Sequence, residues 1–164
     1  MTIWIRPASK INAELLTRIQ VEAFANEVKQ YDFAPPGYDS VDFQIESIKK
    51  FRYFEILSET KVIGGIIVKQ IDRKTCYILR IFISPKWQNT GAGTTAMQLI
   101  ENEFPKAKKW QLDTPYLSFQ NHHFYEKLGY RKIGETKPES NGFYCFLYEK
   151  QVQQKTKTRF AFWR

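Results

Sequence analysis

The segment best suited to chemistry runs from a predicted buried strand through a glycine-containing loop into a predicted helix. It reads Ile83-Ser84-Pro85-Lys86-Trp87-Gln88-Asn89-Thr90-Gly91-Ala92-Gly93-Thr94. Glycines let consecutive backbone N–H groups turn toward one point, and the first turn of the following helix adds its own unpaired N–H groups and the positive end of its dipole. The pattern predicts a site for an anion such as pyrophosphate, although Gly-x-Gly alone is more often an ordinary tight turn before a helix.

Two common phosphate-binding patterns do not fit this loop. A nucleotide-binding P-loop requires Lys and then Ser or Thr after its second glycine, whereas Gly93 is followed by Thr94 and Thr95. The dinucleotide fingerprint requires a third glycine three residues further on and an acidic residue about 20 residues later, within a parallel βαβ unit. The chain has neither feature, so the loop indicates another phosphate-bearing ligand.

A second motif follows the loop, at Phe124-Tyr125-Glu126-Lys127-Leu128-Gly129-Tyr130. It resembles the Phe-Tyr-x-x-x-Gly-Phe/Tyr block of the GNAT superfamily of acyl-coenzyme A dependent N-acetyltransferases. The stretch Gln88-Asn89-Thr90-Gly91-Ala92-Gly93 resembles that family's acetyl-CoA signature, Gln/Arg-x-x-Gly-x-Gly/Ala, after an apolar-x-Pro step. The resemblance covers the predicted elements from residue 2 to 148. It implies a GNAT-like fold and an acetyl-CoA dependent N-acetyltransferase.

The resemblance also implies where the co-substrate, acetyl-CoA, would bind. Backbone amides from Gln88 to Thr94 would hold its pyrophosphate, and its pantetheine arm would run beside the backbone of Phe82 and Ile83. The family often has an Asn seven residues before its catalytic tyrosine; Ser118 stands there in this chain, and Asn121 lies one turn later. The cofactor-binding residues expected on this basis are Phe82, Ile83, Gln88, Asn89, Thr90, Gly91, Ala92, Gly93, Thr94 and Asn121.

Tyr125 is the catalytic residue that the resemblance implies, a general acid near the thioester sulfur, next to Phe124, which we expect to be buried. The reaction needs little covalent help, because a neutral amine attacks the thioester and the leaving thiolate has a pKa near 8.5. Positioning, a donor at the oxyanion and routes for protons supply most of the rate.

The general base is not evident from the sequence. Relatives often carry Glu on the central strand, at the position where this chain has Leu79. The alternatives are Asp113, Glu22, Glu27 or a water chain to a backbone carbonyl. The missing strand carboxylate favours a second function, a catalytically weak CoA-binding sensor or interaction module of the same fold, whereas Tyr125 favours the enzyme.

The acceptor is expected to be a primary amine of a small molecule or a peptide, attacking directly in a ternary complex. Tyr31 and Asp32 begin a proline-bearing loop rich in aromatics and carboxylates, and Asp113 ends a later strand. We expect these three residues to contact the acceptor, since such side chains suit a cationic amine. An ordinary polar loop anchored by aromatics is an equal alternative.

No metal is expected. The two histidines, His122 and His123, are adjacent on a predicted helix and therefore point about 100° apart, so they cannot bind one metal ion as an i, i+4 pair does.

Hydrophobic periodicity predicts the elements that position these residues. The predicted helices cover 10–29, with Ser9 as N-cap, 41–48, 96–104 and 119–128, and the predicted strands cover 2–6, 52–58, 61–71, 75–84, 110–114, 130–134 and 143–148. Residues 76–83 are apolar at nearly every position, which predicts a central strand covered on both faces. The fold class is mixed α/β (α+β), with a largely antiparallel central sheet of about seven strands flanked by helices, in one domain over residues 1–150.

The net charge of +8 suggests nucleic acid until its distribution is considered. Five basic residues and no acidic residue lie from Lys150 onward, which leaves 20 basic against 17 acidic residues in 1–149. Nucleic acid is therefore a disfavoured partner, and 151–164 is predicted to be a basic, aromatic C-terminal extension. We expect Phe160, Phe162 and Trp163 to pack on the body or on a second copy, which would make a homodimer.

Cys76 and Cys145 stand far apart in apolar runs, and we expect both to be buried free thiols. The chain shows no secretory leader and no apolar run of about 18 residues. These features predict a cytoplasmic protein that does not enter a membrane.

Overall fold

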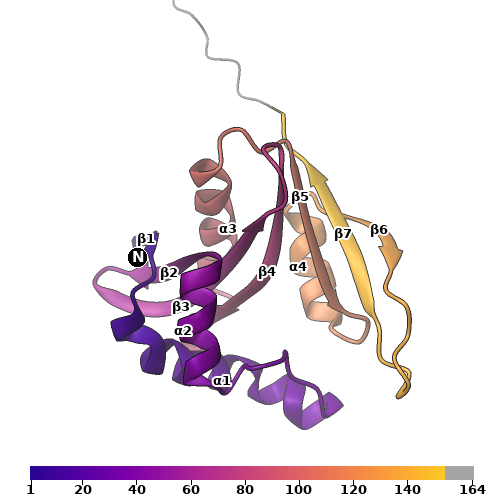
Figure 1. Cartoon of the computed structure of the whole chain (residues 1–164), viewed down its shortest axis with the longest axis horizontal. Coiled ribbons are helices and arrows are strands. Elements are labelled where there is room, and N and C mark those ends of the chain that lie inside the picture. Colours follow the sequence, from indigo (N-terminus) through magenta and orange to yellow (C-terminus); the bar gives the residue numbers. More distant parts are fainter. Residues whose placement is uncertain (154–164) are drawn as a thin grey trace, which may run out of the picture.

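Seven strands form one sheet in the order β1-β2-β3-β4-β5-β7-β6 (Figure 1). The computed structural model describes residues 1–153; the expected packing of Phe160, Phe162 and Trp163 lies outside the described residues. The strands are β1 (Ile3–Pro7), β2 (Arg52–Ser58), β3 (Lys61–Gln70), β4 (Thr75–Ile83), β5 (Lys109–Pro115), β6 (Arg131–Glu135) and β7 (Cys145–Gln151). The α-helices are α1 (Ala13–Tyr31), α2 (Val41–Lys50), α3 (Ala92–Glu103) and α4 (Phe119–Lys127), with 3-10 turns at Lys10–Asn12 and Pro85–Trp87.

The sheet confirms the predicted fold class. β1 to β4 pair antiparallel in sequence order; α1 and α2 connect β1 to β2, and short turns connect β2 to β3 and β3 to β4. β5 and β6 each pair antiparallel with β7. β4 and β5 run parallel, because α3 connects them and returns the chain to the same end of the sheet. Predicted and observed bounds differ mainly at α3, which starts at Ala92, and at β7, which extends to Gln151.

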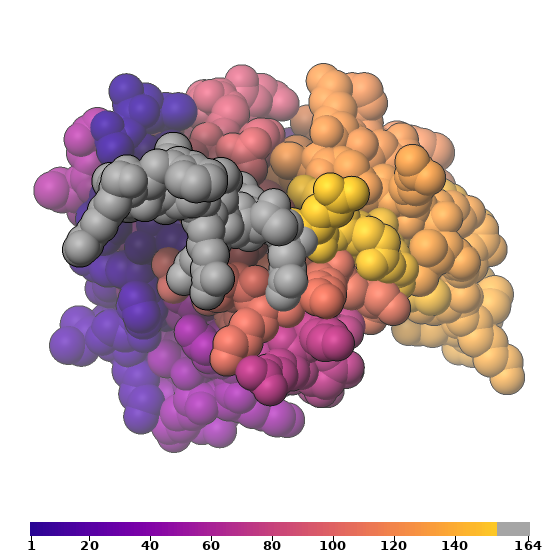
Figure 2. Space-filling view, turned by 90° about the horizontal axis from the view of Figure 1, so that it is seen from above, coloured from indigo at the N-terminus to yellow at the C-terminus, as the bar shows by residue number. Residues whose placement is uncertain are grey.

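Helices cover both faces of the sheet (Figure 1). α1 packs on β3 and β4, and α2 packs beside α1 and on β2. The buried cluster on this face includes Leu16, Ile19 and Phe82. α3 and α4 pack on the opposite face, where Met97, Ile100 and other buried apolar side chains form the larger cluster. Seen from above, the indigo-to-magenta first part of the chain fills one side of the molecule and the orange residues after β5 fill the other (Figure 2).

β4 and β5 separate partway along their length. They pair only from Thr75 to Ile78 on β4, and beyond this point β5 pairs with β7 alone. The separation begins at a β-bulge, because Val68 pairs with Ile78 and Ile67 pairs with Arg80, which leaves Leu79 without a partner on β3. A bulge bends its strand and increases the local twist, so the last residues of β4 turn away from β5.

The prediction that β4 is central and covered on both faces holds for most of the strand: Cys76 and Ile78 lie in the larger core cluster and Phe82 lies in the smaller one. Leu79, the residue without a partner on β3, is the exception, because it remains 41% exposed.

The cysteines are both free, and one of the two burial predictions is wrong. Cys76 is buried inside the core cluster. Cys145 is only partly buried, because it is the first residue of β7, where β5 and β7 both end. Burial raises the pKa of the Cys76 thiol to about 11.

Candidate functional site

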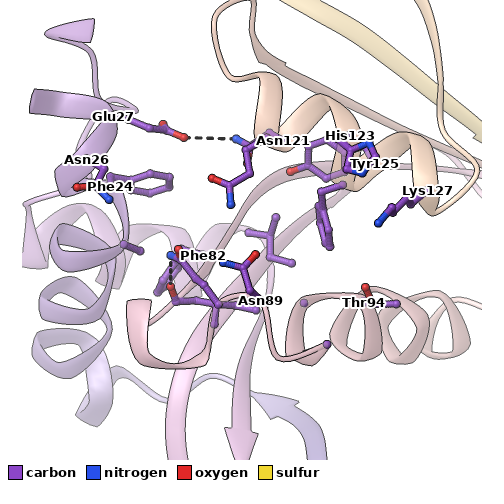
Figure 3. A pocket seen from close by; sticks show the side chains of 18 residues that line it. Phe24, Asn26, Glu27, Phe82, Asn89, Thr94, Asn121, His123, Tyr125 and Lys127 are labelled. Atoms are coloured by element: carbon purple, nitrogen blue, oxygen red, sulfur yellow. Dashed lines mark hydrogen bonds between the residues drawn. The ribbon is translucent and has the colours of Figure 1, made fainter. Parts of the chain in front are cut away.

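A pocket of about 480 Å³ lies where β4 has separated from β5 (Figure 3). Its walls come from the last turns of α1, the end of β4, the loop before α3 and one face of α4. The lining residues are Ala23, Phe24, Asn26, Glu27, Ile81, Phe82, Ile83, Gln88, Asn89, Gly91, Gly93, Thr94, Gln120, Asn121, His123, Phe124, Tyr125 and Lys127. The glycine loop and the Phe-Tyr motif, separate in sequence, therefore share one pocket.

The loop before α3 lines this pocket and carries backbone amides without backbone partners. Gly91 caps α3 with φ of +87°, a left-handed conformation that glycine adopts without strain. The first amide to be bonded is that of Thr95, which donates to the Gly91 carbonyl at 3.0 Å. In the part of the chain that the structure describes, the amides of residues 89–94 have no backbone acceptor. Unpaired amides at a helix start form an anion site.

The backbone amide of Gln88, which was predicted to hold the pyrophosphate, is bonded within the loop instead. Its backbone amide donates to the Pro85 carbonyl at 3.3 Å, so the series of unpaired amides begins at Asn89. Its side-chain Nε2 donates to the Ile83 carbonyl at 3.0 Å and fixes the loop to the end of β4. The Thr90 hydroxyl similarly donates to the Trp87 carbonyl at 2.6 Å. The loop therefore holds its shape through its own side chains.

Gly93 is the point where the loop meets α4. A Cβ atom at this residue would lie 3.2 Å from Cζ of Phe124 and 3.3 Å from Cδ1 of Ile83. Any larger side chain would push these groups or fill the space in front of the amides. Ala92, beside it, is fully buried and anchors the first turn of α3 in the core. Neither Ala92 nor Thr90 lines the pocket with its side chain.

Helix α4 divides its residues between core and pocket. His122 is buried, with Nε2 2.9 Å from the Pro115 carbonyl oxygen and its ring stacked on Phe146. His123, Phe124 and Lys127 face the pocket. The expectation that Phe124 is buried is wrong, because its ring forms part of the pocket wall and stays partly exposed.

Tyr125 lies on the boundary between core and pocket. The residue is 7% exposed, and its ring packs beside Phe124, Tyr130 and Tyr148. Its hydroxyl points toward the side of the pocket where Asn121, one turn earlier on α4, also lies (Figure 3). Burial above all, and then the negative charge of Glu27, raises the pKa of Tyr125 well above its ordinary value. The phenol is therefore a neutral proton donor throughout the physiological pH range.

Glu27 reaches the pocket from the opposite side. Together with Phe24 it extends from α1 toward α4 (Figure 3), and its Oε1 accepts a long hydrogen bond of 3.4 Å from Asn121 Nδ2. Burial raises the pKa of the Glu27 carboxyl, and the bond from Asn121 opposes part of that rise. α1 and α4 thus meet over the pocket through a carboxylate and an amide.

Three residues predicted to bind the acceptor do not line this pocket. Tyr31 ends α1, and Asp32 turns the chain away in the left-handed conformation, with φ of +50°. Asp113 is exposed on β5 and accepts a hydrogen bond of 2.5 Å from the Tyr77 hydroxyl. Glu22, another open alternative for the base, lines a separate hollow of about 250 Å³ beside β3.

Sequence reasoning missed several residues of the pocket wall. Phe24 and Asn26 had no signal, because nothing in the sequence shows that the end of α1 reaches α4. On α4 a signal existed: Gln120, His123 and Lys127 recur at intervals of three and four residues, which places them on one helical face. The same face carries Phe124.

No three His, Cys, Asp or Glu side chains in residues 1–153 gather as metal ligands would. Within the same range, the helices are too short or too polar to span a bilayer.

The stretch of the chain that contributes most of the pocket wall matches a known family. The family model described as "Acetyltransferase (GNAT) family" matches residues 15–130, which include the glycine loop and the Phe-Tyr motif. The chain belongs to the GNAT acetyltransferase family. A curated relative, "Uncharacterized protein YrkN" of Bacillus subtilis (strain 168), is 32% identical over 82 residues, which are 49% of this chain and 44% of that protein. The chain thus matches less than half the length of that relative.

Solved structures show the same GNAT fold. The PaiA N-acetyltransferase from Thermoplasma acidophilum, in complex with coenzyme A, superposes with a TM-score of 0.76 at 18% identity, over 93% of this chain and 100% of that chain. A GNAT family acetyltransferase from Elizabethkingia anophelis, with acetyl-CoA bound, superposes with a TM-score of 0.67 at 19% identity, over 92% of this chain and 98% of that chain. The predicted resemblance to the GNAT family is confirmed.

Proposed function

We propose that the protein is an acetyl-CoA dependent N-acetyltransferase that transfers the acetyl group to a primary amine by direct attack in a ternary complex. The observation that carries this proposal is one pocket that combines the unpaired amides of residues 89–94 with the Tyr125 hydroxyl. One end can hold a phosphate, and the other offers a proton to a leaving thiolate. Such a pair of functions fits acyl transfer from a coenzyme A thioester.

The residues present fit the coenzyme. The amides and helix dipole at the start of α3 suit the pyrophosphate, and Gly93 keeps the approach to them free of a side chain. The backbone of Phe82 and Ile83 lies where the pantetheine arm would run, on the edge of β4 that β5 leaves unpaired. Asn121, at the opposite wall, can bond the arm's amide groups.

An aromatic pair and a carboxylate outside the pocket support a site for the amine acceptor. Phe33, from the loop after α1, stacks on Phe143, from the loop before β7, with ring centroids 4.1 Å apart. Asp113 lies on the same half of the sheet. Aromatic faces with a carboxylate favour a cationic amine of a small molecule or peptide, and Tyr31 and Asp32 stay proposed contacts of that amine.

The second candidate function is a CoA-binding sensor with weak catalysis. The exposed side chain of Leu79 favours it, because the bulged position of β4 offers no carboxylate to the acceptor. Both functions require CoA binding, and acetyl transfer separates them.

We expect coenzyme A and acetyl-CoA to raise the melting temperature of the protein. A ligand that binds only the folded state adds RT ln(1 + [L]/Kd), about 2.7 kcal/mol at 100 times Kd. The measurement is a thermal melt with and without CoA, followed by thiol release from acetyl-CoA with amines, amino acids, aminoglycosides and peptides. Release with one acceptor class supports the enzyme; stabilisation without release for any acceptor supports the sensor. If CoA does not raise the melting temperature, both functions are contradicted.

We expect Lys127→Ala to weaken CoA binding about tenfold, because an ammonium on a phosphate makes a charge-assisted hydrogen bond. Lys127 extends from the end of α4 toward the space above Thr94 (Figure 3). Titration calorimetry at two salt concentrations measures the loss, which should shrink as salt screens the charge. Lys106→Ala is the matched control, since this exposed cation lies past the far end of α3. Equal affinities for the two variants would remove Lys127 from the site.

A further inference from the structure

The pocket contains a carboxylate to which the family pattern gives no role. By the family resemblance, Leu79 stands at the strand position where relatives often carry Glu, and the sequence left Asp113, Glu22 and Glu27 as alternatives. The structure separates these three. Asp113 is exposed and bonded to Tyr77, and Glu22 faces the other hollow. Glu27 alone of the three lines the pocket that holds Tyr125.

We propose that Glu27 is the general base, and that it and Tyr125 act from opposite walls of the same pocket. This inference rests on the proposed function. The position of Glu27 on α1 places the base on a helix rather than on the central strand. Asn121 donates to its carboxylate and so fixes the direction of the side chain across the pocket. With this base on α1, the enzyme needs no carboxylate at the position of Leu79 on β4.

The proton transfers balance with these two groups. The Glu27 carboxylate takes one proton from the acceptor ammonium, and the neutral nitrogen forms the N–C bond with the thioester carbonyl carbon. The C–S bond breaks, and the sulfur takes the hydroxyl proton of Tyr125. The second nitrogen proton returns to the Tyr125 oxygen through water, and Glu27 releases its proton to solvent. One amide, one thiol and one proton result.

The surroundings of Glu27 suit a base. Its carboxyl is partly buried, which raises its pKa toward that of the proton donor and strengthens it as an acceptor. The ionisable groups that face the pocket from α4 are Tyr125, His123 and Lys127, while β4 and the glycine loop contribute none. Of these, His123 is the competing proton acceptor, because Lys127 is a cation and Tyr125 is a neutral phenol.

The decisive variant is Glu27→Gln, which keeps an oxygen to accept from Asn121 but cannot take a proton. We expect kcat/KM to fall at least tenfold, general base catalysis being worth about 10² to 10⁴, while Kd for CoA stays within a few fold. In the parent, kcat/KM should fall as pH drops through the raised pKa of Glu27, and this acid limb should vanish in Glu27→Gln. Glu22→Gln, one or two turns earlier on α1 and exposed, should retain both rate and limb.

Different outcomes overturn different claims. If the parent transfers acetyl but Glu27→Gln keeps the acid limb, or if His123→Gln loses it instead, Glu27 is not the base and the proposed function still stands. If the parent binds CoA and acetylates no amine, the proposed function fails. In that case the pKa of Glu27 tests the inference directly. It can be measured by carbon-13 NMR titration of the Glu carboxyl groups with CoA present, and the Glu27 signal is the one missing in Glu27→Gln. A Glu27 pKa at or below the ordinary Glu value of about 4.3 would refute the inference.

Discussion

The Gly93→Val variant is expected to remain folded and to lose the rise in melting temperature that CoA gives the parent. Phe124 and Ile83 already lie at 3.2 and 3.3 Å from the position of a Cβ atom there, so the extra methyl groups must enter the space in front of the loop amides. The phosphate then cannot approach the donors of residues 89–94. At 100 times the parental Kd, the lost stabilisation is about 2.7 kcal/mol.

Two further glycine variants make this result specific. Gly134→Val, on the outer strand β6, meets its nearest neighbour at 3.8 Å and should respond to CoA as the parent does. Gly91→Val should also lose the response, but for another reason: no atom lies within 4 Å of its Cβ position, and the strain comes from φ of +87°. A folded Gly93→Val protein that still gains stability from CoA would place the phosphate site elsewhere.

The Tyr125→Phe variant is expected to bind CoA within a few fold of the parent and to lose at least tenfold in kcat. The phenol supplies a proton to the departing sulfur, a contribution typically worth about 10² to 10⁴, and water in the pocket can replace part of it. Since burial and the charge of Glu27 raise the pKa of Tyr125, its ionisation should add no limb to the rate profile at neutral pH.

Tyr130→Phe provides the matched control. Tyr130 is buried against Tyr125, outside the pocket, and its hydroxyl has no hydrogen-bond partner among the described residues. Removing this hydroxyl should leave kcat unchanged and cost no stability, because an unpaired buried hydroxyl is unfavourable. Steady-state rates with a verified acceptor compare the three proteins. Equal kcat for Tyr125→Phe and the parent would exclude the tyrosine as proton donor.

Much of the fold was predictable because its signals are local. The alternation and turns of residues 52–84 predict three antiparallel strands, and the structure has them. The glycine loop and α4 motif were also readable, since backbone donors and a helical face depend on neighbouring residues. The exposure of Leu79 could not be predicted from the sequence, because it accompanies a β-bulge that only the pairing of β4 with β3 shows.

The site was predictable only in part for the same reason. Glu27 and Asn121 are 94 residues apart and meet because α1 ends over α4. Tyr31 and Asp32 are only four and five residues after Glu27, yet they turn away from the pocket where Asp32 adopts a left-handed conformation. Their proposed contact with the acceptor therefore depends on the loop that follows α1, whose position the periodicity of α1 did not predict.

The separation of β4 from β5 has a kinetic consequence. Because one unpaired residue in the strand accompanies the gap, the slot for a long flexible thioester is built into the pairing of the sheet. CoA does not have to separate β4 from β5 when it binds. The free-energy penalty of the interrupted strand pairing is part of the folding free energy of the protein. Association of CoA should consequently follow a single concentration-dependent phase, at a rate set by diffusion and orientation instead of by a slow opening of the protein.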